Sequence, residues 1–243
     1  MKIILNGANG RMGRIVEAAI QESGAHSVVA RVDWSFAAGD GYSELNQYEG
    51  LADMVIDFSN HAATQAVTEY CVEHRLPVVI GTTGQTDEEL ALIEAAAKEV
   101  PVFLSGNMSL GVALLADLAK KAAAMFPNAD IEIVERHHNQ KLDVPSGTAL
   151  LLARRIQEAR PQAELVIGRH ENGKRAANEI GIHSLRLGNE VGTHEIIIAN
   201  GSETLTLKHE AEDRALFAQG ALAAAEFLAD KGPGLYDMRN IVE

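Results

Sequence analysis

The sequence predicts an α/β protein in which a doubly wound parallel sheet is combined with a second, α+β domain. Three observations support this fold class. Short apolar β-type runs alternate with helical patterns through the first third of the chain, a glycine-rich turn follows the first run, and closely spaced β-type runs with a hairpin signal come late in the chain. Alternating strands and helices are typical of parallel sheets, whereas strands joined by tight turns pair antiparallel.

The strands expected in the first domain are short and continuously apolar, which indicates burial on both faces of a sheet. Thr86 stands three residues before Glu89, the capping-box spacing that marks the start of a helix. The expected strands are 3–5, 28–32, 54–58, 78–80 and 102–104, and the expected helices are 14–22, 62–73 and 88–99.

The second domain is expected to begin with a long Ala-rich helix at 110–125, which leads out of the first sheet. After it come a β-type segment from Ile131, a helix at 149–158 and a polar segment, 160–178, in which 169–178 fits no element. Tight turns predict antiparallel pairing of successive strands at 183–187, 195–199 and 204–208, with Asn200-Gly201 as a hairpin signal. A last helix is expected at 215–230, before Gly232-Pro233-Gly234 and a short tail.

Composition excludes several classes of function. The 243 residues are 47% hydrophobic and 23% charged, enough for a normal core, and the net charge of −13 with scattered Lys and Arg excludes a general nucleic-acid binder. A single cysteine, Cys71, precludes an intramolecular disulfide and fits a reducing compartment. No signal peptide is visible and no apolar run approaches the ~20 residues of a membrane span, so we expect a cytoplasmic protein with no membrane partner.

The first glycine-rich turn, Gly7-Ala8-Asn9-Gly10-Arg11-Met12-Gly13, lies directly after a strand and before a helix. Small residues there let the backbone approach a pyrophosphate at the helix N-terminus, as in a Rossmann-type site. Asp33, twenty residues past Gly13, ends the second strand and is placed to bind ribose hydroxyls. The alternative is a plain tight turn with an ordinary acidic strand end. Asp33 favours NADH, whereas Arg11 could reach a 2′-phosphate and admit NADPH, so both nucleotides stay open.

Three further turns follow predicted strands: Asp57-Phe58-Ser59, Gly81-Thr82-Thr83-Gly84 and Ser105-Gly106-Asn107-Met108. In an open α/β sheet the carboxyl ends of the strands form the ligand crevice. For each segment alone, an ordinary turn without a binding role explains the sequence at least as well as a ligand-binding loop. Together they are expected to line one edge, facing the nicotinamide half of a dinucleotide.

The stretch 131–149 combines a strand, a polar loop and a helix start. His137, His138 and Lys141 precede Ser146, which is expected to cap the helix and leave the amides of Gly147 and Thr148 pointing outward toward an anion. A metal site is not expected, because adjacent histidines point in different directions and the other histidines form no metal motif. Imidazole and ammonium groups suit proton transfer to an anionic substrate.

Several motifs carry a resemblance to a known family. They are GANGRMG (7–13), DFS (57–59), GTTG (81–84), ERHHNQKLDVPSGTA (135–149), LRLGNEVGTHEI (185–196), HEAEDRALFAQGA (209–221) and GLYDMRN (234–240). With these motifs the chain resembles the 4-hydroxy-tetrahydrodipicolinate reductase family, also called dihydrodipicolinate reductases, of lysine and diaminopimelate biosynthesis. The resemblance implies an oxidoreductase that reduces a small cyclic dicarboxylate to tetrahydrodipicolinate with NADH or NADPH.

The resemblance also implies a role for each matching residue. His137 takes the position of the catalytic histidine and Lys141 that of a proton-donating lysine. Substrate-binding positions fall on His138, Gly147 and Thr148. Cofactor positions fall on Gly7, Ala8, Asn9, Gly10, Arg11, Met12, Asp33, Gly81, Thr82, Thr83, Ser105, Gly106, Asn107 and Met108.

The family pattern further implies a dinucleotide-binding domain of residues 1–108 plus 214–243, a substrate-binding and oligomerisation domain of residues 109–213, and a homotetramer. The chain departs from the pattern at Met108, where an aromatic residue is frequent, at Asn139-Gln140, which replace more basic residues, and at Trp34, where some members carry Arg. The last departure weakens the case for a strong NADPH preference.

Two other functions are compatible with parts of the sequence. A different NAD(P)-dependent dehydrogenase, acting on an amino- or dicarboxylate such as homoserine or aspartate, would share the first domain, but the lysine-plus-PSGTA loop disfavours it. A nucleotide-sensing regulatory protein would not need the His137/Lys141 pair. Which of these two side chains gives the proton stays open.

Overall fold

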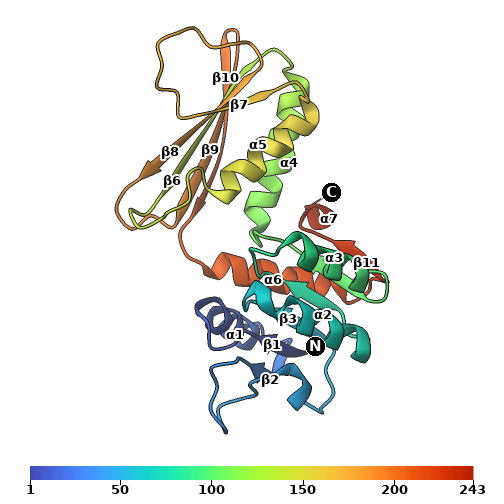
Figure 1. Cartoon of the computed structure of the whole chain (residues 1–243). Helices are drawn as coiled ribbons and strands as arrows, with labels where there is room; N and C mark the ends of the chain where they lie inside the picture. Colours follow the sequence, from blue (N-terminus) through green and yellow to red (C-terminus); the bar gives the residue numbers. More distant parts are fainter. Residues whose placement is uncertain (243) are drawn as a thin grey trace. The chain divides into compact units, whose positions relative to one another are not determined.

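The computed structural model describes residues 1–242 and divides into two compact units. The first unit comprises Met1–Ser109 and Arg214–Ile241, and the second comprises Leu110–Asp213. The first unit contains a six-stranded sheet and the second a five-stranded sheet (Figure 1). The predicted fold class, a Rossmann-type parallel sheet with a second α+β unit, is confirmed.

All neighbouring strands of the first sheet are parallel, in the order β11-β5-β4-β3-β1-β2. The five strands predicted for this sheet are present within one residue of their expected ends. The sixth, β11, lies in the tail for which no strand was expected. The strands are β1 (Lys2–Asn6), β2 (Ser27–Val32), β3 (Met54–Asp57), β4 (Val78–Ile80), β5 (Pro101–Leu104) and β11 (Gly234–Tyr236).

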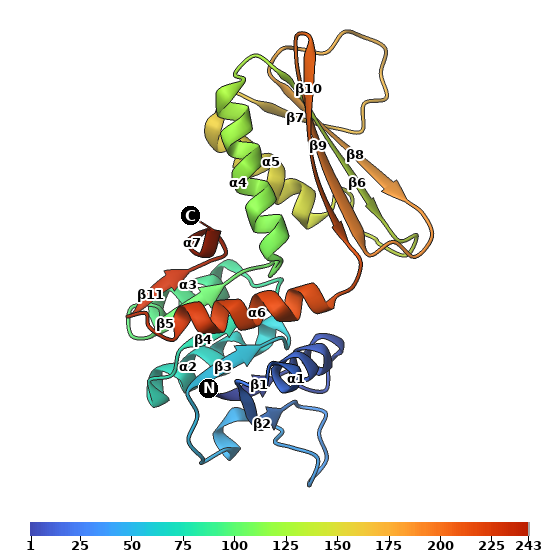
Figure 2. The same cartoon turned by 180° about the vertical axis from the view of Figure 1, so that it is seen from behind.

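Helices cover both faces of this sheet: α1 packs against α6, and α2 packs against α3 (Figure 2). Val55 faces the α2 and α3 side, whereas Phe103 meets the ring of Phe227 from α6 at 6.2 Å between centroids. The predicted capping box at Thr86 and Glu89 is confirmed. The helices are α1 (Arg11–Ser23), α2 (Thr64–His74), α3 (Asp87–Ala96), α6 (Ala215–Leu228) and the short α7 (Arg239–Val242), with single 3₁₀ turns η1 (Leu45–Gln47) and η2 (His61–Ala63).

The second unit places two helices on one face of a mixed sheet with the order β10-β9-β6-β8-β7. The two helices pack on each other along their length. The elements are α4 (Leu110–Met125), β6 (Asp130–His137), α5 (Gly147–Ala159), β7 (Glu164–Ile167), β8 (Glu179–Arg186), β9 (Gly192–Asn200) and β10 (Glu203–Ala211).

One expectation for this unit is wrong. The expected antiparallel pairing of β8 with β9 does not occur, because β6 lies between them, parallel to β8 and antiparallel to β9. Ile131 and Ile133 of β6 are fully buried, so this strand is most stable at the centre of the sheet with a partner on each side. The polar segment 160–178 also contains an unexpected edge strand, β7. The Asn200-Gly201 hairpin between β9 and β10 is confirmed.

The inward faces of the central strands change from apolar to polar at one end of the sheet. Fully or almost fully buried isoleucines come first: 131 and 133 in β6, 180 and 182 in β8, and 196 and 198 in β9. Because side chains alternate along a strand, the same faces continue with Glu135 and His137, with Arg186, and with His194. These polar groups therefore lie on the helix-covered face, at the end where α5 begins.

Arg160, the first residue after α5, ties that helix to α4. Its side chain is buried, and its guanidinium donates hydrogen bonds to the carbonyls of Ala123 at 3.2 Å, Ala129 at 2.8 Å, and Phe126. The carbonyls of the last helical turn have no partner within the helix. Arg160 supplies a partner for the carbonyl of Ala123 in the last turn of α4, and for the carbonyls of Phe126 and Ala129 that follow this helix. It thereby fixes the position of α5, whose first residues border the polar cluster.

Replacing Arg160 by Ala should lower the free energy of unfolding by about 3 kcal/mol, because it leaves buried carbonyls without a donor. Chemical denaturation followed by circular dichroism measures this change. Arg154→Ala, on the exposed face of α5, is the matched control and should leave stability nearly unchanged. Equal stability of the two variants would contradict the capping role of Arg160.

Candidate active site

The β1–α1 turn approaches the end of β3 so closely that it admits only glycine at two positions. A Cβ on Gly7, whose φ is +78°, would lie 2.3 Å from the carbonyl oxygen of Phe58, and a Cβ on Gly13 would lie 2.1 Å from the carbonyl oxygen of Gly7. The helix α1 then begins at Arg11 without a side-chain cap at Gly10. The first backbone amides of α1 have no partner within the helix, and the glycine-rich turn leaves space beside them, so this position is suited to a phosphate group.

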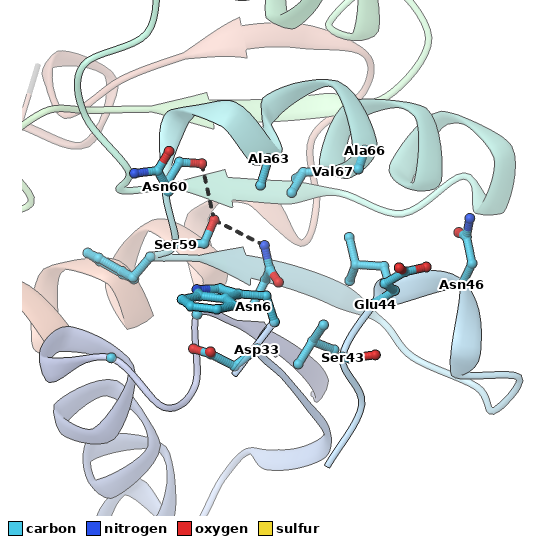
Figure 3. Close-up of a pocket in the computed structure, with 16 residues that line it drawn as sticks. Asn6, Asp33, Ser43, Glu44, Asn46, Ser59, Asn60, Ala63, Ala66 and Val67 are labelled. Atoms are coloured by element: carbon cyan, nitrogen blue, oxygen red, sulfur yellow. Dashed lines mark hydrogen bonds between the residues drawn. The ribbon is translucent and has the colours of Figure 1, made fainter. Parts of the chain in front are cut away.

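A cavity of about 500 Å³ lies beside this turn, at the carboxyl ends of β1, β2 and β3 (Figure 3). The strand order reverses at β1, which is where ligands bind in open α/β sheets. Asp33 lines the cavity and is held rigidly. Its carboxylate accepts hydrogen bonds from the amide of Asn9 at 3.1 Å, and from the amide and hydroxyl of Ser35 at 3.0 and 2.6 Å.

A second cavity, of about 300 Å³, collects most of the remaining predicted cofactor residues. Phe58 lines both cavities, so the two adjoin within the first unit. The second cavity is lined by Arg11, Met12, Phe58, Gly81, Gly106, Asn107, Met108, Arg214 and Phe217. Arg11 therefore lies at this cavity and does not line the one that contains Asp33.

The other predicted cofactor residues support the walls without lining either cavity. Ala8 is fully buried and its amide donates to Val32, Thr82 is buried, and the hydroxyl of Ser105 donates to the carbonyl of Asn107. Thr83 is exposed on its turn. Residues that had no predicted role also line the cavities: Trp34, Ser43, Glu44, Leu45 and Asn46 at the first, and Arg214 and Phe217 at the second. The last two belong to a motif of the resemblance, but 43–46 carry no sequence signal.

A buried carboxylate, Asp57, joins the loops beneath the first cavity. It accepts hydrogen bonds from the side chains of Asn6 at 2.7 Å, Ser59 at 2.6 Å and Thr82 at 2.6 Å. Asn6 is the last residue of β1, and Ser59 and Thr82 follow β3 and β4. Burial raises the pKa of Asp57 although these hydrogen bonds oppose the rise. Asp57 thus determines the relative positions of three strand-end loops.

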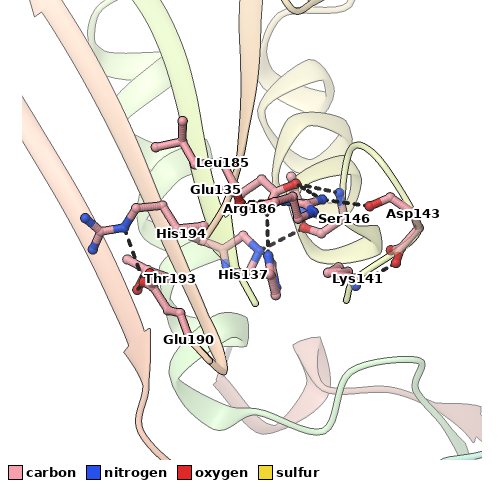
Figure 4. Close-up of polar contacts among 12 residues, drawn as sticks. Glu135, His137, Lys141, Asp143, Ser146, Leu185, Arg186, Glu190, Thr193 and His194 are labelled. Carbon is pink, nitrogen blue, oxygen red and sulfur yellow. Dashed lines mark hydrogen bonds and ion pairs between the residues drawn. The ribbon is translucent and has the colours of Figure 1, made fainter. Parts of the chain in front are cut away.

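The predicted catalytic His137 belongs to a buried polar cluster of the second unit (Figure 4). Its Nδ1 lies 2.5 Å from the carboxylate of Glu135, which is completely buried. Arg186 donates to both oxygens of that carboxylate at 2.8 Å, and the amide of Ser146 donates at 3.1 Å. Neither Glu135 nor Arg186 had a predicted role.

His194, which also had no predicted role, packs edge-on against His137 with ring centroids 5.1 Å apart. The hydroxyl of Ser146 accepts a hydrogen bond from the amide of Ala149, as predicted for the helix cap, and lies 3.0 Å from Nε2 of His194. Burial, together with the charge of His137, lowers the pKa of His194 to about 3. His194 is therefore neutral at neutral pH.

Lys141 lies in the loop between β6 and α5, where it forms an ion pair of 2.8 Å with Asp143. Hydrogen bonds from Lys141, and from backbone amides that include that of Gly147, hold the pKa of Asp143 below its usual range. The ammonium group and the start of α5 thus already bind a carboxylate of the protein itself. His138 is half-buried at the end of β6, and Thr148 is half-buried in the first turn of α5.

Among residues 1–242, no group of three or more His, Cys, Asp or Glu side chains is arranged to hold a metal ion. Within the same part of the chain, no helix combines the length and apolar character that a membrane crossing requires.

Comparison with known proteins adds a family to this geometry. The model of the dihydrodipicolinate reductase N-terminus matches residues 1–108, and the model of the C-terminus matches residues 111–242. The chain belongs to the dihydrodipicolinate reductase family. A 4-hydroxy-tetrahydrodipicolinate reductase of Caldanaerobacter subterraneus subsp. tengcongensis is 44% identical, over 100% of this chain and 98% of its own length. A protein of the same name from Clostridium tetani is 42% identical, over 98% and 95%.

A solved structure of the same family and one of a different enzyme share the fold of this chain. A dipicolinate-bound dihydrodipicolinate reductase from Paenisporosarcina sp. TG-14 superposes with a TM-score of 0.83 at 28% identity, and 99% of each chain is covered. An aspartate dehydrogenase from Thermotoga maritima has a TM-score of 0.53 at 12% identity, over 95% of this chain and 97% of its own. The second likeness extends to the fold alone.

Asp57→Ala should lower the free energy of unfolding by about 2 kcal/mol and weaken nucleotide binding, because two buried donors and one half-buried donor lose their acceptor and the loops separate. Thermal unfolding and a fluorescence titration with NADH measure the two effects. Glu94→Ala, on the exposed face of α3, is the control and should change neither. Unchanged NADH affinity in Asp57→Ala would show that this carboxylate does not shape the cavity.

Proposed function

We propose that this chain reduces 4-hydroxy-tetrahydrodipicolinate to tetrahydrodipicolinate, with a reduced nicotinamide nucleotide as the second substrate. The observation that carries the proposal is the end-to-end family match, which covers the cavities of the first unit and the polar cluster of the second. The relatives that share this name are oxidoreductases that align over almost their whole length. The glycine cradle at Gly7 and Gly13 fits a pyrophosphate, which supports the nucleotide.

The donors at the start of α5 support a dicarboxylate substrate. Lys141 and the amide of Gly147 hold the carboxylate of Asp143, which makes this a place where carboxylates are bound. A substrate carboxylate would take over these donors, with Thr148 and His138 as further partners. Ion pairing and amide donation are the interactions that proteins use for such groups.

The substrate carries a hydroxyl group that the product lacks. Its loss as water requires one proton in addition to the hydride. The net reaction adds one hydride and one proton to the substrate and releases its hydroxyl as water. The bound nicotinamide supplies the hydride. The residues of this chain bind the dicarboxylate, exclude water and move the proton, for which His137 and Lys141 are the candidate donors.

The first cavity favours NADH over NADPH. Two carboxylates, those of Asp33 and Glu44, line this cavity. None of the described residues that line it is Lys or Arg. A 2′-phosphate on the adenosine ribose would stand close to Asp33 and be repelled by it. Arg11, the residue that could have reached that phosphate and admitted NADPH, lines the second cavity instead.

The homotetramer implied by the resemblance stays a prediction. The sheet face away from α4 and α5 supports it, because Leu185 is 46% exposed there and Val134 and Ile197 are half-buried. Apolar side chains on one open sheet face are typical of a surface that pairs with another copy.

The direct test of the activity is an assay in which the synthase product is made freshly in the cuvette. NADH oxidation should depend on both that product and this protein. A nucleotide-sensing regulatory protein would bind NADH without consuming it, so binding without oxidation would contradict the proposed function.

Lys141→Ala should lower kcat by about 100-fold, within the range that general acid–base catalysis contributes, and leave the Kd for NADH unchanged. The reason is that Lys141 lies in the second unit, whereas the nucleotide cavities belong to the first. Lys121→Ala, an exposed lysine of the same unit, is the control. Equal losses of turnover and of NADH affinity would count against the assignment.

The kcat/KM for NADH should exceed that for NADPH by at least about tenfold, or about 1.4 kcal/mol. Trp34→Arg should narrow this difference by placing a cation beside the ribose, whereas Trp34→Gln should not. Steady-state kinetics with both nucleotides measures the ratios. A wild-type enzyme that uses the two nucleotides equally would contradict the role given to Asp33.

A further inference from the structure

The imidazole of His137 is held through one nitrogen. Nδ1 lies 2.5 Å from the carboxylate of Glu135, two residues earlier on the same face of β6. A carboxylate without a proton can only accept hydrogen bonds, so Nδ1 carries the hydrogen. Nε2 is then the nitrogen through which the ring gains or loses a proton.

Glu135 is itself hydrogen-bonded through both carboxylate oxygens and ionised. It is completely buried, with Arg186 donating to both oxygens at 2.8 Å and the amide of Ser146 donating at 3.1 Å. Burial opposes its charge, but the hydrogen bonds from His137, Arg186 and Ser146 hold the pKa of Glu135 well below its usual range. The partner of Nδ1 therefore keeps its charge and its place throughout the neutral pH range.

The imidazole of His137 approaches Gly192 on its Nε2 side so closely that a larger residue would not fit there. A Cβ on Gly192 would lie 2.9 Å from Nε2 of His137 and 3.2 Å from its Cδ2. The backbone of Gly192 is not in the left-handed region, so its conformation does not demand glycine. The missing side chain makes room for the ring in this orientation.

The remaining ionisable groups that face the ring are already paired or neutral. Lys141 pairs with Asp143, and Arg186 pairs with Glu135. Burial lowers the pKa of His194 on β9 and that of His209 on β10. Among the described residues, Glu135 is thus the anion in direct contact with His137.

We infer that Glu135 is a positioning residue for the reduction: it fixes the tautomer and direction of His137 so that Nε2 delivers the proton that the net reaction consumes. This inference rests on the proposed function. The proton leaves Nε2 for the substrate oxygen that departs as water, and solvent returns a proton to Nε2. Glu135 stays ionised throughout, held by Arg186.

The first test measures the tautomer and needs no activity. Nitrogen-15 spectra of the histidine-labelled protein should show neutral His137 protonated at Nδ1. In Glu135→Gln this preference should be lost. A wild-type His137 protonated at Nε2 would overturn the inference, whether or not the protein turns over substrate.

The second test is the pH dependence of kcat. Glu135→Gln should lower kcat by about 100-fold. It should also move the alkaline limb of the profile to lower pH, because loss of the neighbouring negative charge disfavours the protonated ring that gives the proton. Glu132→Gln is the matched control, because Glu132 also lies on β6 and also pairs with a histidine, His183 of β8, at 2.9 Å, but on the opposite face of the sheet. Its profile should match that of the wild type.

Gly192→Ala provides a variant that leaves every charge in place. The added methyl group should displace the ring and lower kcat at least about tenfold, within what acid–base positioning contributes, without altering the Kd for NADH. Gly173→Ala, where a Cβ meets open space, should be neutral. An active wild type whose Glu135→Gln and Gly192→Ala variants keep its kcat and pH profile would overturn the inference. An inactive wild type would instead overturn the proposed function.

Discussion

The buried carboxylate of Glu135 is the constraint on which the second unit depends. A charge removed from water is tolerated only when it is fully hydrogen-bonded. Glu135 meets this requirement with donors from three elements: His137 of β6, Arg186 of β8 and the first amide before α5, that of Ser146. The loop that carries Lys141 starts at one of these donors, His137, and ends at another, Ser146. Its two ends are therefore fixed by a single anion.

The first unit uses the same device with a different electrostatic outcome. Asp57 is also a buried carboxylate that joins strand-end loops, but its donors are neutral side chains. Burial therefore raises its pKa, whereas the guanidinium of Arg186 helps to keep Glu135 ionised. Asp57, which has no cationic partner among these donors, is suited to holding the strand-end loops together. Glu135, with its permanent charge, is suited to orienting a group that carries a proton.

Local sequence patterns predicted the first sheet, the helix 110–125 and the motif residues, because short buried strands and capped helices leave periodic signals. They did not predict the partners of His137. Arg186 and His194 lie about 50 residues away in sequence, and only the strand order β9-β6-β8 brings them together. The expected pairing of β8 with β9 concealed this arrangement. One signal was available: β6, β8 and β9 each change from alternating isoleucine to polar residues at the same end of the sheet. The edge strands β7 and β11 are short, only partly buried and without such a pattern, so they were missed.

We propose that the second unit binds a dicarboxylate at the start of α5, beside the Glu135–His137 pair, while the first unit binds the nucleotide. An amide NMR titration with dipicolinate tests it most directly. We expect saturable shifts at Gly147, Thr148 and Lys141, and loss of the ion pair between Lys141 and Asp143. Shifts confined to the first unit, or no saturable shifts in 138–149, would contradict it.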